Sequence, residues 1–258
     1  MNEVDSAIAQ LRVDGQVALV TGASSGIGAD VAKLLARRGA VVAVNYRLGT
    51  DRAAAVVKAI QAKGGSGAAF QADVTQVDQI KRMYDQVVQQ LGPVDILVNN
   101  AGAFWEIKPF LEISDALWRE SIDLNLMAAI FCSRAVLPNM IERRYGRIVN
   151  LSSVVTRTGG AGESEHYAVP KAGLELLTLG LAREFGQYGI TVNSIAPGLV
   201  DTAIHDAHRE RFDRLAALYG PLRRASTVRE VAETVAFMAA PASSYVNGQV
   251  LHVSGGVV

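Results

Sequence analysis

Hydrophobic residues along this chain alternate between short continuous runs and longer stretches with helical spacing. The short runs are typical of strands buried on both faces, and seven are predicted, over residues 17–21, 40–45, 68–74, 94–99, 146–151, 191–196 and 249–253. Between them, apolar residues recur three or four positions apart, as at Ile27, Val31 and Leu34, which predicts helices. This alternation predicts an α/β fold, a single Rossmann-type doubly wound domain whose seven-stranded parallel sheet carries helices on both faces.

Glycines and capping residues predict where several helices begin or end. Gly39 ends the first helix, and a helix over residues 51–63 stops at Gly64 and Gly65. Further helices are predicted over residues 77–91 and after Ser114, and Thr227 with Glu230 forms a capping box. Because no linker or internal repeat is visible, residues 14–258 are expected to form one domain after an extension over residues 1–13.

Composition narrows the class of protein. The 258 residues are 50% hydrophobic, which is enough for one large core. The 25 basic residues are balanced by 25 acidic residues, which argues against a nucleic-acid or membrane-binding surface. A single cysteine, Cys132, fits a reducing compartment. No signal peptide or run of about 20 apolar residues is apparent, so a cytoplasmic protein is predicted.

A glycine-rich segment, Thr21-Gly-Ala-Ser-Ser-Gly-Ile-Gly28, joins the first strand to the first helix. Gly22 permits the tight turn, Gly26 lets the backbone approach a pyrophosphate, and Gly28 lets the helix pack on the strand. The helix start then offers free N–H groups to the anion. The spacing is a variant of the dinucleotide-binding fingerprint, and the simpler alternative is an ordinary strand-to-helix turn.

The same segment also matches the nucleophile elbow of serine hydrolases, with Ser24 as nucleophile. Asp201 and His252 follow in the chain order that such a triad requires. However, the elbow would follow the first strand, whereas the hydrolase fold needs earlier strands in its sheet. Dinucleotide binding is therefore the favoured interpretation.

The end of the second strand bears on which dinucleotide is bound. It reads Val44-Asn45-Tyr46-Arg47, with no carboxylate to bind a ribose 2′-hydroxyl. Arg47 can instead bind a 2′-phosphate, which favours NADP(H) over NAD(H). The alternative for Arg47 is a solvated side chain at a strand end.

Tyr167 and Lys171 stand four residues apart in a predicted helix, so their side chains share a face. A neighbouring ammonium lowers the pKa of a phenol from about 10 toward the working pH, where general acid–base catalysis is efficient. Taken alone, such a pair is more often an exposed amphipathic pair.

Together these segments resemble the short-chain dehydrogenase/reductase family, over nearly the whole chain from about residue 14. The resemblance is greatest to the bacterial 3-oxoacyl-carrier-protein reductases. The matching pieces are residues 21–28, Asp73-Val74, Asn-Asn-Ala-Gly at 99–102, Asn125, Ser153, Tyr167 with Lys171, and Pro197-Gly-Leu-Val-Asp-Thr202.

The resemblance implies roles for these residues. Tyr167 would be the general acid, Lys171 would bind the nicotinamide ribose and lower the tyrosine pKa, and Ser153 would hold the carbonyl oxygen. Asn125 would support a water-linked proton relay. The residues implied to bind NADP(H) are Gly22, Ser24, Ser25, Gly26, Ile27, Gly28, Asn45, Tyr46, Arg47, Asp73, Val74, Asn99, Ala101, Gly102, Tyr167, Lys171, Pro197, Gly198, Val200 and Thr202.

The implied activity is the NADP(H)-dependent reduction of a small-molecule ketone or 3-oxoacyl carbonyl to a secondary alcohol. The alternatives within the family are an alcohol, sugar or steroid dehydrogenase. Outside the enzymes, the alternative is a dinucleotide-binding regulator. A homotetramer is implied, with contacts from the helices at 114–143 and 164–187 and from the last strand.

Several features depart from the family's usual pattern or are left open by it. The spacing from Ser153 to Tyr167 is one residue longer than usual, so Ser152 is an alternative catalytic hydroxyl. Pro170 lies inside the helix and predicts a local kink. Arg144 matches one residue that docks the acyl carrier protein, but Tyr188 replaces the other, which leaves that partner in question.

Residues 203–226 are expected to form a substrate lid. His205 and His208 in this lid are interpreted as solvated rather than as metal ligands, and no metal is predicted. Phe104, Trp105 and Tyr219 are candidates for an apolar substrate pocket.

Overall fold

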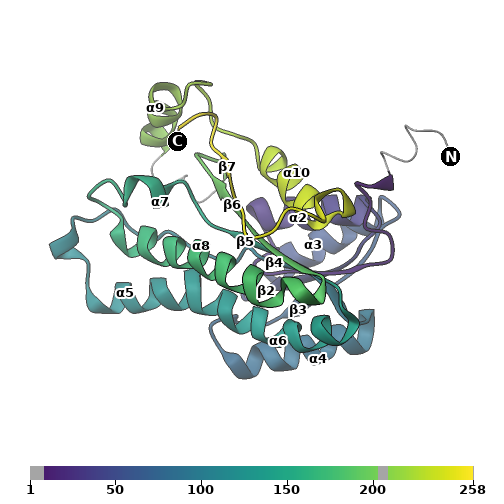
Figure 1. The fold of residues 1–258 in the computed structure, drawn as a ribbon. Coiled ribbons are helices and arrows are strands. Elements are labelled where there is room, and N and C mark those ends of the chain that lie inside the picture. The colour runs from purple at the N-terminus through teal and green to yellow at the C-terminus, as the bar shows by residue number, and fades with distance from the viewer. Residues whose placement is uncertain (1–8, 203–208, 258) are drawn as a thin grey trace.

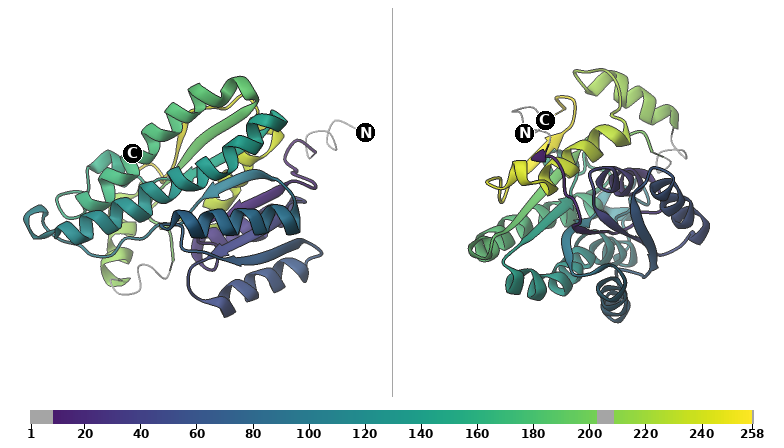
Figure 2. Two further views of the ribbon diagram at one scale, coloured as in Figure 1. Left: turned by 90° about the horizontal axis from the view of Figure 1, so that it is seen from below. Right: turned by 90° about the vertical axis from the view of Figure 1, so that its right-hand side faces the viewer.

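The computed structural model describes residues 9–202 and 209–257, and within them a parallel sheet lies between two layers of helices (Figures 1 and 2). The sheet has seven strands in the order β3-β2-β1-β4-β5-β6-β7, which confirms the predicted fold class. The strands are β1 (Val17–Val20), β2 (Val41–Tyr46), β3 (Ser66–Gln71), β4 (Val94–Asn99), β5 (Gly146–Leu151), β6 (Ile190–Pro197) and β7 (Val250–Val253).

The helices cover the sheet in two groups. One face carries α2, α3 and α10, and the other carries α4, α6 and α8. The longer helices are α2 (Gly26–Arg37), α3 (Thr50–Gln61), α4 (Val77–Leu91), α5 (Asp115–Ile122), α6 (Ala128–Arg143), α8 (Glu165–Phe185), α9 (Arg209–Tyr219) and α10 (Val228–Ala239). The short elements are η1 (Phe110–Glu112), the π-helical turn η2 (Asp123–Met127), α7 (Val155–Thr158), η3 (Gly186–Tyr188) and η5 (Pro241–Ser243).

Alternate residues of each strand enter different cores because successive side chains point to opposite faces of a sheet. In β1, Ala18 and Val20 pack with the helices α2 and α10, whereas Val17 and Leu19 pack with α4 and α6. Both faces of the central strands are therefore buried, as their continuous apolar runs predict.

The strand order reverses between β1 and β4. From β1 the chain moves outward to β2 and β3, and then it returns to β4 on the other side of β1. Ligands of doubly wound sheets bind at such a switch point, outside the carboxyl ends of the strands. The glycine turn after β1, Asn99 at the end of β4 and Ser153 after β5 all lie at the carboxyl ends of these strands.

Two elements differ from the predictions. β3 ends at Gln71 rather than at residue 74, because the Asp73 carboxylate accepts hydrogen bonds from the backbone N–H and hydroxyl of Thr75 and closes a turn. The helix after Ser114 begins as predicted, with the Ser114 hydroxyl accepting from the Leu117 N–H, but the π-helical turn η2 interrupts it.

The helical run Asp115–Arg143 is long and apolar enough, by length and composition alone, to cross a membrane. This differs from the expectation that no segment of the chain would qualify. In its most apolar window 44% of the residues are buried inside the molecule, and Cys132, Val136 and Met140 belong to the core beside the sheet. The run is thus a core helix of this fold.

Part of the predicted N-terminal extension and part of the lid, including His205 and His208, lie outside the described residues. Among the described residues, no group of three or more His, Cys, Asp or Glu side chains is placed to hold a metal ion.

Candidate active site

The glycine turn packs closely against the segment that follows β4. A Cβ atom on Gly22 would lie 3.0 Å from the Ala101 Cα, and one on Gly28 would overlap the Asn100 side chain. Gly26 differs, because its nearest neighbour would be the Thr202 methyl group at 3.8 Å. Gly22 and Gly26 also have positive φ angles, which glycine adopts at little cost. The turn is thus closed on its inner side and open at Gly26, as a cradle for a pyrophosphate requires.

Polar side chains hold this turn from behind. The Thr21 hydroxyl accepts from the N–H groups of Asn100 and Ala101, both at 3.0 Å, and the Asn100 amide donates to the Thr21 carbonyl at 2.8 Å. The Asn45 side chain accepts from the Gly22 N–H at 3.1 Å and donates to the Ala72 carbonyl at 3.1 Å. Asn45 therefore shapes the turn from within the sheet.

Several other predicted cofactor residues also face the interior. The Asn99 amide donates to the Asn150 side chain at 2.8 Å, and Asn99 is buried. Tyr46 and Val74 belong to the two cores, and Ile27 packs against the first of them. Their side chains thus pack in the interior, behind the backbone that forms this part of the site.

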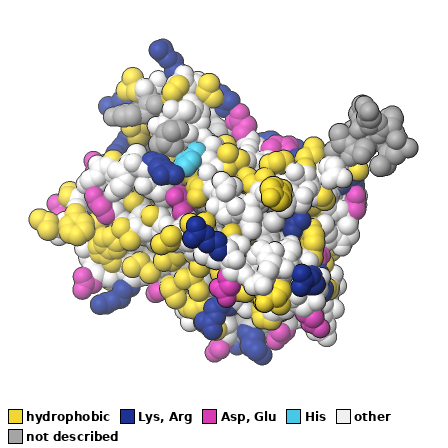
Figure 3. Space-filling model, in the orientation of Figure 1, with side chains coloured by type: hydrophobic (Ala, Val, Ile, Leu, Met, Phe, Trp, Pro, Cys, Tyr) yellow, Lys and Arg dark blue, Asp and Glu magenta, His cyan; other side chains and the backbone are white. Residues whose placement is uncertain are grey.

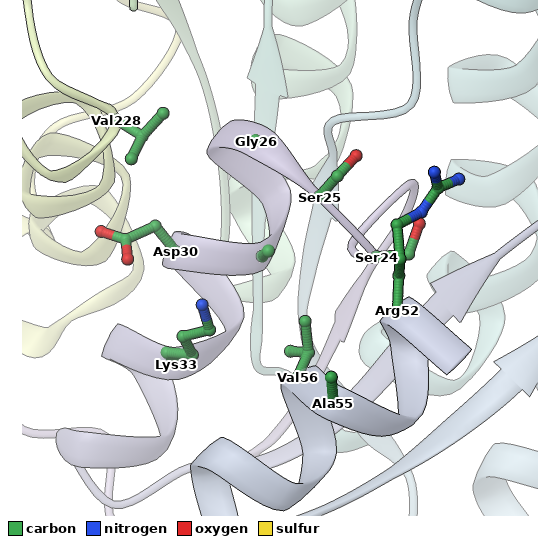
Figure 4. A pocket seen from close by; sticks show the side chains of 10 residues that line it. Ser24, Ser25, Gly26, Asp30, Lys33, Arg52, Ala55, Val56 and Val228 are labelled. Atoms are coloured by element: carbon green, nitrogen blue, oxygen red, sulfur yellow. The ribbon is translucent and has the colours of Figure 1, made fainter. Parts of the chain in front are cut away.

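A hollow of about 410 Å³ opens beside the glycine turn (Figure 4). Ser24, Ser25 and Gly26 form its wall, and Arg52 from the first turn of α3 lies beside Ser24. Arg47 does not line this hollow. Its side chain is 59% exposed, and its guanidinium lies 3.8 Å from the Asp73 carboxylate. Sequence reasoning missed Arg52 because no strand-end pattern marks a residue inside a helix.

Tyr167 and Lys171 share one face of α8, since the Lys171 Nζ lies 5.6 Å from the centre of the Tyr167 ring. Lys171 is only 3% exposed, and its Nζ donates to the Leu151 carbonyl at 2.6 Å. The helix assignment is continuous through Pro170, from Glu165 to Phe185.

Burial dominates the electrostatics of this pair. It lowers the pKa of Lys171 to about 8 and raises the pKa of Tyr167 to about 12, while a hydrogen bond with Ser153 acts to lower the tyrosine pKa. The expected lowering of the Tyr167 pKa by Lys171 is not the leading effect. Removal of the phenolate from water raises this pKa by more than the neighbouring groups lower it. The phenol therefore keeps its proton at neutral pH, the form in which it can act as an acid.

The two candidate serines have different surroundings. The Ser152 hydroxyl donates to the Glu175 carboxylate at 2.8 Å, and Ser152 is 4% exposed. Ser153 is more exposed and interacts with the Tyr167 hydroxyl. Ser153 is therefore the serine beside the tyrosine.

Asn125 lies in the π-helical turn η2 and clamps the loop after β4. Its side-chain oxygen accepts from the Ala103 N–H at 3.2 Å, and its nitrogen donates to the Ala103 carbonyl at 3.0 Å. A Cβ on Gly102 would lie 2.8 Å from the Asn125 oxygen and 3.2 Å from the Lys171 Nζ. Asn125 and Lys171 thus flank the same point of the backbone.

The loop after β6 approaches the open side of the glycine turn. The Gly198 N–H donates to the Val253 carbonyl at 3.0 Å, and Val200 is buried and paired with Ser226. These contacts direct the chain from Pro197 toward Thr202, which faces Gly26.

The residues of the alternative hydrolase triad have other partners. Asp201 pairs with Arg209 at 2.7 Å, and the His252 imidazole accepts from Arg157 at 3.2 Å. These contacts do not bring the carboxylate and the imidazole together with Ser24.

Arg144 lies at the amino ends of the strands, opposite to the end that carries the candidate site. It precedes the first residue of β5, whereas Ser153 follows the last, and its guanidinium donates to the Gln187 carbonyl at 2.8 Å. Within this chain, Arg144 is thus remote from the tyrosine and lysine.

Comparisons with known proteins agree with this geometry. A family model described as enoyl-(acyl carrier protein) reductase matches residues 22–258. The 3-oxoacyl-[acyl-carrier-protein] reductase of Staphylococcus aureus is 41% identical over 240 residues, which cover 93% of this chain and 97% of the relative. The same enzyme of Vibrio harveyi is 38% identical over 252 residues, covering 96% and 99%.

Solved structures of similar fold include a gluconate 5-dehydrogenase from Burkholderia cenocepacia in complex with NADP and tartrate. It is 32% identical, with a TM-score of 0.91, and the match covers 97% of this chain and 98% of that one. A dehydrogenase/reductase from Sinorhizobium meliloti is 33% identical, with a TM-score of 0.89 and coverage of 98% and 99%. NADP(H) is thus used within this group of proteins. With its parallel sheet, glycine cradle and tyrosine–lysine pair, this chain belongs to the short-chain dehydrogenase/reductase family of oxidoreductases.

Proposed function

We propose that this protein is an NADP(H)-dependent carbonyl reductase that converts a ketone or 3-oxoacyl compound to a secondary alcohol. The observation that carries the proposal is the grouping of Tyr167, Ser153 and Lys171 at the switch point of the sheet. The tyrosine keeps its proton, interacts with Ser153 and lies on the same helix face as a buried lysine.

Each of the three residues has a distinct role in this reaction. Tyr167 donates its phenolic proton to the carbonyl oxygen as that oxygen gains negative charge. The Ser153 hydroxyl donates a hydrogen bond to the same oxygen and stabilises the developing charge. The ammonium of Lys171 stabilises the tyrosinate that remains, since an opposite charge within a few ångströms favours the ionised form. Asn125 would support the return of a proton to this pair through Lys171.

NADPH would supply the hydride, held by the glycine cradle with the loop from Pro197 to Thr202 on its other side. The 2′-phosphate would be bound beside the turn, by Ser24 and Arg52 from the hollow and by the exposed Arg47, which lies outside the hollow. A guanidinium matches the geometry of a phosphate group, and the end of β2 carries no carboxylate that would repel it. In the hollow itself, the carboxylate of Asp30 is accompanied by the ammonium of Lys33.

A fluorescence titration of NADPH and NADH tests this assignment. We expect Arg47→Ala and Arg52→Ala to weaken NADPH binding by about tenfold or more and to leave NADH binding unchanged. Arg82→Ala, which changes an exposed arginine on α4, is the matched control. Equal losses for both dinucleotides would show that neither arginine reads the 2′-phosphate.

The acceptor is proposed to be fairly apolar because an aromatic side chain lies against the tyrosine. The Phe104 ring packs edge-on against Tyr167 at 5.5 Å and stacks on His166 at 6.1 Å. The relatives named 3-oxoacyl-carrier-protein reductases favour a 3-oxoacyl thioester, whereas the gluconate 5-dehydrogenase favours a sugar acid as the second candidate.

NADPH oxidation followed by absorbance separates these candidates. The panel would contain a 3-oxoacyl thioester, cyclic ketones, a steroid ketone and, in the oxidative direction, gluconate with NADP⁺. Turnover of the thioester or ketones supports the proposal, and turnover of gluconate alone supports the sugar-acid candidate. Tight NADPH binding without turnover of any compound would favour a dinucleotide-binding regulator.

A homotetramer is also proposed. Large hydrophobic side chains are exposed on η1 and α8 (Figure 3), with Leu111 at 93%, Val169 at 54% and Leu176 at 71% exposure. Surface of this kind favours association, and a monomer in a solution mass measurement would contradict it. We further expect the enzyme to work in the reducing cytoplasm, where the buried Cys132 remains a thiol.

A further inference from the structure

Pro170 leaves one backbone carbonyl of α8 without its usual hydrogen-bond donor. It is the sixth residue of the helix, so the N–H that should donate to the His166 carbonyl is missing. An unpaired buried carbonyl is costly, and such groups are almost always satisfied by another donor. Here the donor comes from α5, because the Ser121 hydroxyl donates to the His166 carbonyl at 2.7 Å.

The same hydroxyl also fixes the side chain of Asn125. Ser121 and Asn125 are four residues apart, and the Asn125 amide nitrogen donates to the Ser121 oxygen at 3.2 Å. A hydroxyl has one proton to donate. Since that proton is directed to His166, the Ser121 oxygen can only accept from Asn125, and this sets which end of the amide faces it.

The orientation of this amide matters at the reaction centre. With its nitrogen toward Ser121, Asn125 presents its oxygen to the Ala103 N–H and toward the backbone position that Lys171 also flanks. His166 immediately precedes Tyr167 on α8. Ser121 thus joins the helix turn that carries the tyrosine to the side chain beside the lysine, and it is completely buried.

We propose that Ser121 is a positioning residue for the carbonyl-reducing centre, required because Pro170 leaves the His166 carbonyl without its helical partner. This inference rests on the proposed function. It predicts that the two residues are coupled, because restoring an N–H at position 170 gives the carbonyl another donor and makes the Ser121 hydroxyl less necessary.

A double-mutant cycle with Ser121→Ala, Pro170→Ala and both together tests the coupling. We expect Ser121→Ala to lower kcat by roughly ten- to hundredfold with the NADPH dissociation constant unchanged, because it disturbs orientation rather than cofactor binding. In the Pro170→Ala background, the fold loss of kcat caused by Ser121→Ala should be at least three times smaller than in the wild-type background. The melting temperature, measured on the same four proteins, should show coupling of the same sign.

Two further variants separate hydrogen bonding from packing. Ser121→Cys fills nearly the same space with a weak donor, so it should lose almost as much activity as Ser121→Ala, and it replaces that variant should the alanine protein not fold. Ser243→Ala is the matched control, a fully buried serine in η5 whose hydroxyl also donates to a backbone carbonyl, that of Met238 in α10. It should lower the melting temperature and leave kcat unchanged.

Wild-type kcat in Ser121→Ala or in Ser121→Cys, or equal losses with and without Pro170, would overturn the inference. Absence of turnover in the wild-type protein would instead contradict the proposed function, and the melting temperatures would then still report on the coupling of Ser121 with Pro170.

Discussion

Replacing the buried lysine tests the electrostatics of the site most sharply. Lys171→Met removes an ammonium whose pKa burial lowers from 10.5 to about 8. Since one pKa unit corresponds to about 1.4 kcal/mol, the charged lysine costs the folded state about 3 kcal/mol at pH 7. The variant also loses the hydrogen bond to the Leu151 carbonyl, worth about 1 kcal/mol. We therefore expect the variant to be more stable by about 2 kcal/mol at pH 7, which corresponds to a melting temperature higher by about 4–8 °C.

The sign of the pH dependence follows from the same pKa. Between about pH 8 and 10.5 the unfolded chain holds a proton on this lysine that the folded chain has released, so wild-type stability rises with pH. The advantage of the variant should therefore be complete below pH 8 and nearly absent at pH 9.5, when melting temperatures are compared at pH 7 and 9.5. Lys58→Met, at an exposed position on α3, is the control, because it removes a lysine side chain that the fold does not bury. A variant less stable than wild type at pH 7, or an advantage independent of pH, would refute this reasoning.

Three further changes test other parts of the structure. Ser153→Ala should lower turnover roughly 10²-fold by removing the donor to the carbonyl oxygen, whereas Ser152→Ala should mainly reduce stability; the reverse would make Ser152 the catalytic hydroxyl. Gly28→Ala should lower the free energy of unfolding, measured in urea, by about 1–3 kcal/mol, because its Cβ would lie 2.8 Å from the Gly22 carbonyl oxygen. In the control Gly180→Ala, the added Cβ meets no atom within 4 Å, so this variant should be neutral or stabilising. Glu230→Gln should lower the melting temperature at pH 6 and much less at pH 2, since Arg224 and the Thr227 N–H lower the pKa of this carboxylate to about 2. A loss of the same size at both pH values would contradict this.

The sheet and most helices are predictable because their signals are local. The helix over residues 77–91 and the strands at 94–99 and 146–151 have the predicted ends, since apolar periodicity and neighbouring glycines mark them directly. The capping box at Thr227 and Glu230 is likewise formed. The sequence predicts that β3 ends at residue 74 rather than at Gln71, because Asp73 forms a turn through its own side chain and apolar periodicity does not reveal such a turn.

The supporting contacts of the site depend on residues far apart in the chain. Asn125 bonds to Ala103, 22 residues away, and Ser121 bonds to His166, 45 residues away. The motifs predict that Tyr167 and Lys171 meet, because four residues make one helical turn. They do not predict the direction of the tyrosine pKa shift, because that depends on how deeply the surrounding helices bury the ring.

The central claim is that the phenol of Tyr167 protonates a carbonyl while NADPH is consumed beside it. The most direct measurement is a single-turnover experiment in which absorbance follows NADPH with a 3-oxoacyl thioester or ketone, for wild type and Tyr167→Phe at saturating cofactor. The account predicts that both proteins bind NADPH equally and that the variant consumes it about 10²–10⁴-fold more slowly. Consumption by Tyr167→Phe at the wild-type rate would contradict it.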